Sequence, residues 1–171
     1  MHRTKGIVAL VLLLLIPPSG LCTARQTVGN VGWNTLKTFC NSGKELRVLD
    51  RYKEAELLRH EGKGCLTHMW FGGDWPGYEK TRIRIFVDGE SNPSIDMELG
   101  TGHGCGFGDN ATPWGSEKMG KTGQPSGIYN TYRIPFGTSI RVTAQRHKDS
   151  PDGAPFWWII RGTENLPATI G

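Results

Sequence analysis

Residues 82–104 constrain the fold most strongly, because they read as two alternating segments joined by a turn and followed by glycines. In the first segment, Ile83, Ile85 and Val87 share one face of an extended chain. The second segment repeats this pattern with Ile95, Met97 and Leu99. A period of two is typical of a half-buried strand, and turn-forming residues join the segments. We therefore predict an antiparallel hairpin.

The register of this hairpin follows from its apolar faces, which must meet because a slip of one residue would turn every side chain of one strand over. This requirement places Arg84 opposite Asp96 or Glu98. Cross-strand ion pairs of this kind contribute only about 0.2 to 1 kcal/mol each. We interpret the two carboxylates as partners of Arg82 and Arg84 rather than as catalytic groups, since ion-pair networks also gather acids.

Further strands are expected on both sides of the hairpin. Residues 65–71 and 156–161 are apolar at successive positions, which predicts strands that are buried on both faces. Residues 128–135 and 139–144 also have strand character. Many short strands with almost no helix predict an all-β protein, an antiparallel β-sandwich of the jelly-roll type. A closing strand this apolar should be covered by more chain or by another subunit.

The amino terminus has the layout of a secretory signal peptide. Arg3 and Lys5 precede the apolar run 7–16, which is too short to span a bilayer comfortably, and small residues follow at 22–24. We predict cleavage after residue 24 and a secreted, extracellular chain with no membrane association. Residues 25–58 are predicted to form an arm or linker of uncertain structure, and residues 59–171 the jelly-roll domain.

Charge argues against nucleic acid as a partner. The chain has 20 basic and 16 acidic residues, so that removal of Arg3 and Lys5 with the signal peptide leaves 18 against 16 and a formal charge of +2. The basic residues are spread along the sequence and no nucleic-acid-binding motif is present.

Three cysteines remain after signal cleavage, an odd number for an oxidising compartment. We favour a disulfide between Cys65 and Cys105, which leaves Cys40 free and makes His68 and His103 incidental. The alternative is a structural zinc site made by the two cysteines and the two histidines. Export makes the disulfide the better expectation.

Two loops could carry function. Trp75 lies in the glycine-flanked loop 72–78, which predicts either a sugar-stacking platform or, in our preferred interpretation, an aromatic plug. The irregular stretch 100–127 is longer than compact domains normally contain without a function or disorder. Within it, Asn110 begins an Asn-Ala-Thr glycosylation acceptor, weakened by the proline that follows.

No sequence motif assigns a catalytic residue. Nucleophile elbows, phosphate-binding loops and zinc-protease helices are absent from the sequence, and neither a metal nor another cofactor is expected. A glycosidase needs two carboxylates about 5 to 9.5 Å apart, a distance that sequence cannot supply. The acidic residues available are Glu90, Asp96, Glu98, Asp109, Glu117 and Glu164.

Three segments in the same order resemble the amino-terminal half of the domain-of-unknown-function 2961 family, now associated with glycoside hydrolase family 172. They are GKGCLTHMW from residue 62, RIRIFVDGE from residue 82 and GIYNTYRIPFGTSIRVTAQ from residue 127. The resemblance implies a jelly roll that is normally paired with a second one, assembly as a trimer or hexamer, and hydrolysis of furanosides without a metal.

Length limits what this resemblance implies. Family members are more than twice as long, and their two catalytic glutamates lie in the part that follows, so the catalytic residues stay unknown. The chain is expected to be a fragment of a furanoside-active enzyme or a shortened relative that binds carbohydrate; the alternative is a non-catalytic component of the extracellular matrix. Because the first jelly roll helps to form the active-site rim in such oligomers, the expected substrate contacts are His68, Trp70, Trp75 and Trp114.

Overall fold

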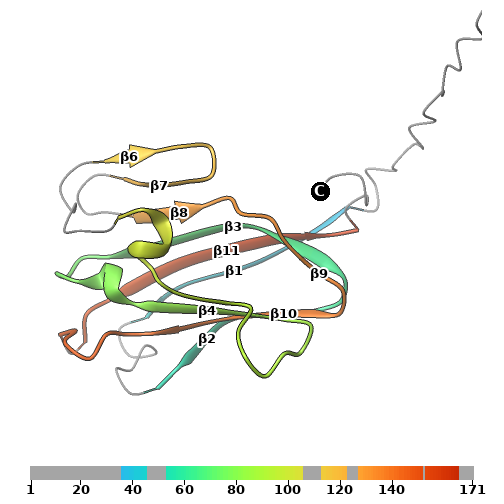
Figure 1. Ribbon diagram of the computed structural model, residues 1–171, viewed down its shortest axis with the longest axis horizontal. Coiled ribbons are helices and arrows are strands. Elements are labelled where there is room, and N and C mark those ends of the chain that lie inside the picture. The colour runs from blue at the N-terminus through green and yellow to red at the C-terminus, as the bar shows by residue number, and fades with distance from the viewer. Residues whose placement is uncertain (1–35, 46–52, 106–112, 123–126, 152, 166–171) are drawn as a thin grey trace, which may run out of the picture. The chain divides into compact units, whose positions relative to one another are not determined.

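The computed structural model describes residues 36–45, 53–105, 113–122, 127–151 and 153–165, all within the unit Gly32–Gly171. These residues form two antiparallel sheets, drawn as two layers in Figure 1. The larger sheet has the order β1 (Lys37–Glu45), β11 (Phe156–Glu164), β3 (Gly64–Gly73), β8 (Gly127–Asn130), β7 (Met119–Lys121) and β6 (Trp114–Gly115), with β9 (Ile134–Phe136) paired to β3. The smaller sheet has the order β2 (Ala55–Glu61), β10 (Ser139–Gln145), β4 (Arg82–Val87) and β5 (Ile95–Glu98).

The strand order is that of a jelly roll. The larger sheet contains the order β1-β11-β3-β8 and the smaller sheet the order β2-β10-β4-β5, so the eight main strands form the two four-stranded layers of that fold. Two short 3-10 helices, η2 (Tyr78–Lys80) and η3 (Thr101–His103), precede and follow the hairpin β4–β5 in the sequence and lie at its open end, where the Gly100 N–H donates to the Glu79 carbonyl. The predicted all-β, antiparallel sandwich is confirmed.

Apolar side chains from the inner faces of both sheets form the core. Alternate positions along each strand point inward, and removing a large side chain of this kind from water stabilises the fold by about 1.5 to 3 kcal/mol. The largest fully buried side chains include Leu57, Leu66, Met69, Phe71, Ile83, Ile85, Leu99, Ile128, Ile140, Phe156 and Ile160.

The predicted hairpin forms with one of the two predicted registers. Ile83 pairs with Met97 and Arg84 with Asp96. The Asp96 carboxylate lies 2.6 Å from Arg82 Nε and 3.4 Å from Arg84 Nε, and the hydrogen bond from Arg82 lowers the pKa of Asp96. The interpretation of Asp96 as an ion-pair partner is confirmed. Glu98 lies opposite Arg82 in the same register.

The sandwich extends into the segment that the sequence suggested was an arm or linker. Strand β1 pairs with β11 over its whole length, and β2 pairs with β10. Strand β1 has few apolar side chains, and most of its side chains whose burial is described are exposed. Its sequence therefore shows no apolar period from which a strand could be predicted. The predicted signal peptide, residues 1–24, lies outside the described residues.

Strands β3 and β11 bury only one of their faces fully. Met69, Phe71 and Ile160 face the core, whereas Trp70 and Ile159 on the opposite face are partly exposed. The expectation of burial on both faces is therefore wrong for the outer face of the larger sheet. Among the described residues, none of the helices has the length and apolar character needed to cross a bilayer.

Candidate functional site

An aromatic surface covers the outer face of the larger sheet. It consists of Trp70, Tyr129, Trp157 and Ile159, which lie on three neighbouring strands and are all partly exposed. The strand register places Trp70 directly between Ile159 on β11 and Tyr129 on β8. Residues paired in this way point to the same side of a sheet, so their side chains form one continuous surface.

Trp70 lies flat on this surface because two neighbouring residues have no side chain. A Cβ atom added to Gly127 would lie 2.3 Å from Nε1 of the Trp70 indole, and one added to Gly72 would lie 2.7 Å from its Cη2. Both glycines are buried beneath the ring. The indole therefore covers the sheet with one face and presents the other outward, as a stacking platform requires.

Two glycines also lie beneath the side chain of Tyr129. Its hydroxyl lies 2.6 Å from the position of an added Cβ atom at both Gly115 and Gly120, and it donates a hydrogen bond to the Ser116 carbonyl at 3.2 Å. Two aromatic rings are thus held against the sheet by glycines from β3, β6, β7 and β8. The sequence shows these glycines, but only the strand pairing shows that they lie under the rings.

The other residues predicted to contact substrate lie in different places. His68 is on the same face of β3 as Trp70 and is partly exposed, and burial lowers the pKa of its imidazole. Trp114 is on β6, with its ring 3.0 Å from an added Cβ atom at Gly104. Trp75 is only 6% exposed, and its indole donates a hydrogen bond to the Pro155 carbonyl. Trp75 therefore has the position of an aromatic plug and leaves no ring face open to a ligand.

A second feature, a groove of about 260 Å³, lies on the outer face of the smaller sheet. We define the groove by the residues that line it: Arg59, Phe86, Gly89, Glu90, Ser139, Ile140 and Arg141. Its size is just below the range of about 300 to 1,000 Å³ typical of sites for drug-sized ligands, so it suits a single small molecule or one sugar unit. Sequence reasoning missed this groove because its lining comes from three strands and a turn.

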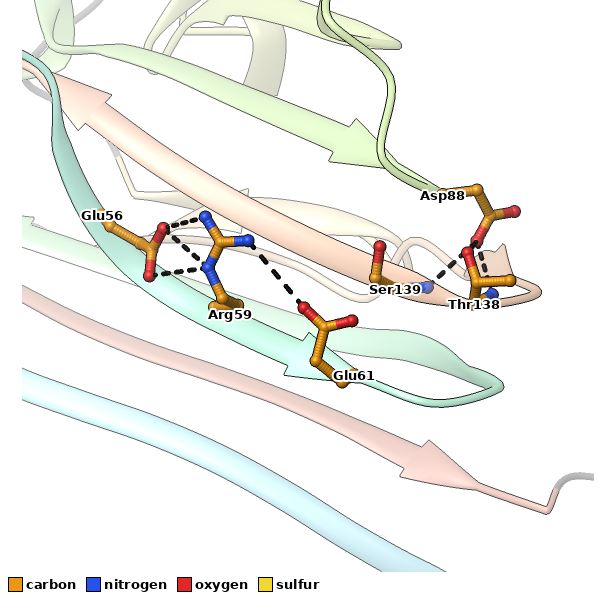
Figure 2. Close-up of polar contacts among 6 residues, drawn as sticks. All are labelled: Glu56, Arg59, Glu61, Asp88, Thr138 and Ser139. Carbon is orange, nitrogen blue, oxygen red and sulfur yellow. Dashed lines mark hydrogen bonds and ion pairs between the residues drawn. The ribbon is translucent and has the colours of Figure 1, made fainter.

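Asp88 precedes Gly89 and hydrogen-bonds to Ser139, two of the residues that line the groove. Its carboxylate accepts hydrogen bonds from the backbone N–H groups of Gly137, Thr138 and Ser139 at 2.9, 2.6 and 3.1 Å. Figure 2 shows this carboxylate beside Thr138 and Ser139, at the start of β10. These bonds lower the pKa of Asp88 to about 2. The left-handed backbone of Asp88, with φ of 52°, is a conformation that aspartate tolerates better than most residues.

An Asp88→Asn variant should be less stable at neutral pH and less sensitive to acid. The folded-state pKa of about 2 lies below the unfolded value of about 3.9, so the charged form stabilises the fold above pH 4 and this contribution is lost as pH falls toward 2. Urea unfolding midpoints measured from pH 2 to pH 7 should therefore fall less steeply below pH 4 in the variant. Identical slopes for the two proteins would contradict this role.

The acids considered for catalysis do not converge in the groove. Glu90 is the one carboxylate that lines it, and Glu164 instead lies 3.0 Å from Nε2 of His60. Asp96 is paired with arginines, Glu117 is exposed in the turn between β6 and β7, and Asp109 is outside the described residues. Hydrolysis by two carboxylates needs a second acid across the glycosidic bond. The described residues therefore assign no catalytic pair.

The cysteines are free in the described structure. Cys65, at the start of β3, directs its thiol to the Leu66 carbonyl, and Cys105, after η3, directs its thiol to the His103 carbonyl. The disulfide expected between them is not formed, because Cys65 pairs across the sheet with Pro135 and Thr163 and not with the segment around η3. Within the described ranges, no three histidine, cysteine or acidic side chains are grouped to hold a metal ion. Asn110, the predicted glycosylation site, lies outside those ranges.

His103 has a structural role that the sequence did not reveal. It is fully buried, with Nδ1 2.7 Å from the Leu99 carbonyl and Nε2 2.5 Å from the Asn130 amide nitrogen. Because a carbonyl only accepts, Nδ1 carries the proton and Nε2 accepts from Asn130. Burial lowers the pKa of His103, which keeps the ring neutral. Leu99 follows β5 and Asn130 ends β8, so this histidine links the two sheets.

Comparison with known proteins gives one family match. The model described as GH172 first beta-sandwich domain matches residues 24–164, which is more than half of the chain. A search of curated proteins found no match. The matched range contains every described strand, including those of the aromatic surface and the groove.

Proposed function

The chain belongs to glycoside hydrolase family 172, whose first β-sandwich domain it contains, and from this premise we propose that it acts on or binds carbohydrate outside the cell. Furanosides are the proposed substrate class. The catalytic carboxylates would be supplied by residues beyond those described, and this domain would hold the sugar. Two observations support export: the apolar segment that follows Arg3 and Lys5, and a family match that begins at residue 24, where signal cleavage is expected.

The aromatic surface is the observation that carries this proposal. The Trp70 indole lies over Gly72 and Gly127, and the hydroxyl end of the Tyr129 ring lies over Gly115 and Gly120. Both residues are partly exposed and lie side by side on neighbouring strands. The face of an aromatic ring is electron-rich and attracts the weakly positive C–H groups on one side of a sugar ring. Glycines beneath the rings keep the platform flat, which suits a planar array of C–H groups better than a pocket would.

A second candidate function is that of a non-catalytic extracellular matrix component that works by assembling. Ile159 and Trp157 add apolar area to the aromatic surface along β11, next to Trp70 on β3. Exposed apolar patches of this kind often mark contacts between proteins. In this alternative, another domain or subunit would cover the aromatic surface, in a trimer or hexamer such as the family resemblance implies.

A carbohydrate titration separates the two functions. The purified chain should bind arabino- and fructo-oligosaccharides, seen as changes in the indole N–H signals of its NMR spectrum. Trp70→Ala should weaken binding about tenfold, because the stacking face is lost. Tyr129→Ala should weaken it as well, whereas Tyr129→Phe retains the ring and should bind normally.

Unchanged affinity in Trp70→Ala, or no binding of any neutral oligosaccharide by the parent protein, would remove the support for sugar recognition by this surface. The matrix alternative predicts instead that Ile159→Arg converts an oligomer into a monomer in light-scattering measurements. A change of Ile159 that leaves the molar mass unaltered would argue against assembly through this surface.

A further inference from the structure

Arg141 is the unusual residue of the groove. It lies at the centre of the smaller sheet, paired across β10 with Arg59 on one side and Phe86 on the other. Like charges directly opposite each other on two strands destabilise a sheet. The guanidinium carbon of Arg141 lies 3.7 Å from the centre of the Phe86 ring. This stacking holds the side chain in place, and the planar N–H groups can still meet a ligand at their edges.

The neighbouring arginines on this face of the sheet have carboxylate partners. Arg59 Nη2 lies 2.8 Å from the Glu56 carboxylate and Arg59 Nη1 lies 3.9 Å from that of Glu61. Arg82 and Arg84 share Asp96. Figure 2 shows Arg59 between its two acids along β2. No carboxylate in the described part of the chain lies within ion-pair distance of Arg141. Arg141 therefore lines the groove as an immobilised cation that has no ion-pair partner among the described residues.

The remaining lining determines which anion suits this cation. Glu90 brings a negative charge to the rim, and Ser139 brings a hydroxyl. Glu90 would repel a doubly charged phosphate about twice as strongly as a singly charged carboxylate, and one carboxylate matches the single charge of Arg141. Arginine binds a carboxylate with two parallel N–H donors. Glu90 and Ser139 can each accept a hydrogen bond from a sugar hydroxyl.

We propose that the groove binds a uronic acid unit of an acidic polysaccharide, with the sugar carboxylate on Arg141 and sugar hydroxyls on Glu90 and Ser139. This inference rests on the proposed carbohydrate function and adds a second, chemically different subsite on the opposite sheet. The aromatic surface takes neutral sugar faces by stacking, and the groove takes the acidic unit by charge. The volume of about 260 Å³ accommodates one such unit and not a long chain segment.

Titration of the purified chain with galacturonate, glucuronate and a galacturonate trimer tests the proposal, with galactose, glucose and acetate as comparisons. NMR signals of Phe86, Ser139 and Arg141 should shift with the uronates and not with the neutral sugars. Acetate should bind more weakly than either uronate, because it lacks the hydroxyls. Arg141→Gln should weaken uronate binding about ten- to a hundredfold, the range expected for loss of a charge-assisted hydrogen bond. Arg141→Lys should bind with intermediate affinity, because lysine lacks the two parallel donors.

Arg82→Gln is the matched control, since Arg82 lies on the same face but is occupied by Asp96. It should leave uronate binding unchanged, and circular dichroism should show that all three variants are folded. The proposal would be overturned if Arg141→Gln bound uronates as tightly as the parent protein does. It would also be overturned if galactose or acetate bound with the same affinity as the uronates. Binding of neutral oligosaccharides that depends on Trp70, together with no uronate binding, would refute the groove alone. No binding of any sugar would refute the groove and the proposed function together.

Discussion

Trp75→Ala should lower the free energy of unfolding by about 3 to 5 kcal/mol, the range found when a buried tryptophan is truncated. The Trp75 ring packs edge-on against Tyr78, with centroids 6.2 Å apart, and the guanidinium carbon of Arg146 lies 5.2 Å from the ring centroid. Truncation would leave a cavity beside η2 and remove the hydrogen bond to the Pro155 carbonyl. Urea unfolding followed by far-ultraviolet circular dichroism measures the loss.

Trp70→Ala is the matched control for this prediction, because it removes the same side chain from a partly exposed position. We expect it to cost only about 1 to 2 kcal/mol, since less apolar area is removed from contact. Trp75→Phe should recover much of the stability by refilling the cavity, without the hydrogen bond to Pro155. Equal losses for Trp70→Ala and Trp75→Ala would contradict the assignment of Trp75 as a plug and Trp70 as a surface platform.

His103→Ala should also destabilise the fold by about 3 to 5 kcal/mol, through a buried cavity and two polar groups left without partners. The Asn130 amide and the Leu99 carbonyl would both lose the imidazole that joins them. His103→Phe fills the cavity and keeps the edge-on contact with Phe71, but it leaves the same two groups unsatisfied. The loss of unfolding free energy in His103→Phe should therefore be smaller than in His103→Ala but still measurable by urea unfolding.

The pH dependence provides an independent check on His103. Its pKa is lowered in the folded state, so the unfolded chain binds a proton more readily, and stability should decrease as pH falls below about 6.5. His103→Phe should make this decrease shallower. Some decrease in stability should remain in His103→Phe, because burial lowers the pKa of His68 as well. An unchanged slope between pH 7 and pH 5 would contradict a buried, neutral His103.

The hairpin was the most predictable part of the fold, for a local reason. Its alternation spans strands β4 and β5 with one turn between them, so side-chain period and apolar faces limit Arg84 to a position opposite Asp96 or Glu98. The structure selects Asp96. Strand β1 was not predictable in this way. Its partner β11 lies more than a hundred residues later in the chain, and its exposed side chains carry no clear period.

The candidate site was predictable only in its residue types. The resemblance to family 172 predicts substrate contacts at both Trp70 and Trp75. Burial distinguishes the two residues: Trp70 is partly exposed on the outer face of the sheet, and Trp75 is enclosed in the core. The groove had no local signature, since Arg59, Phe86 and Arg141 come from three separate strands and each is unremarkable in its own segment.

By itself, the sequence determined the class of fold, the hairpin with two possible registers, and the resemblance to family 172, because these depend on side-chain period and on ordered local segments. Only the tertiary structure decided which face of β3 meets solvent, which glycines lie under Trp70, and that Arg141 in the groove has no carboxylate within ion-pair distance among the described residues. These features depend on pairing between distant strands. A strand's own sequence shows two alternating faces, and only its neighbours decide which face is covered and by what.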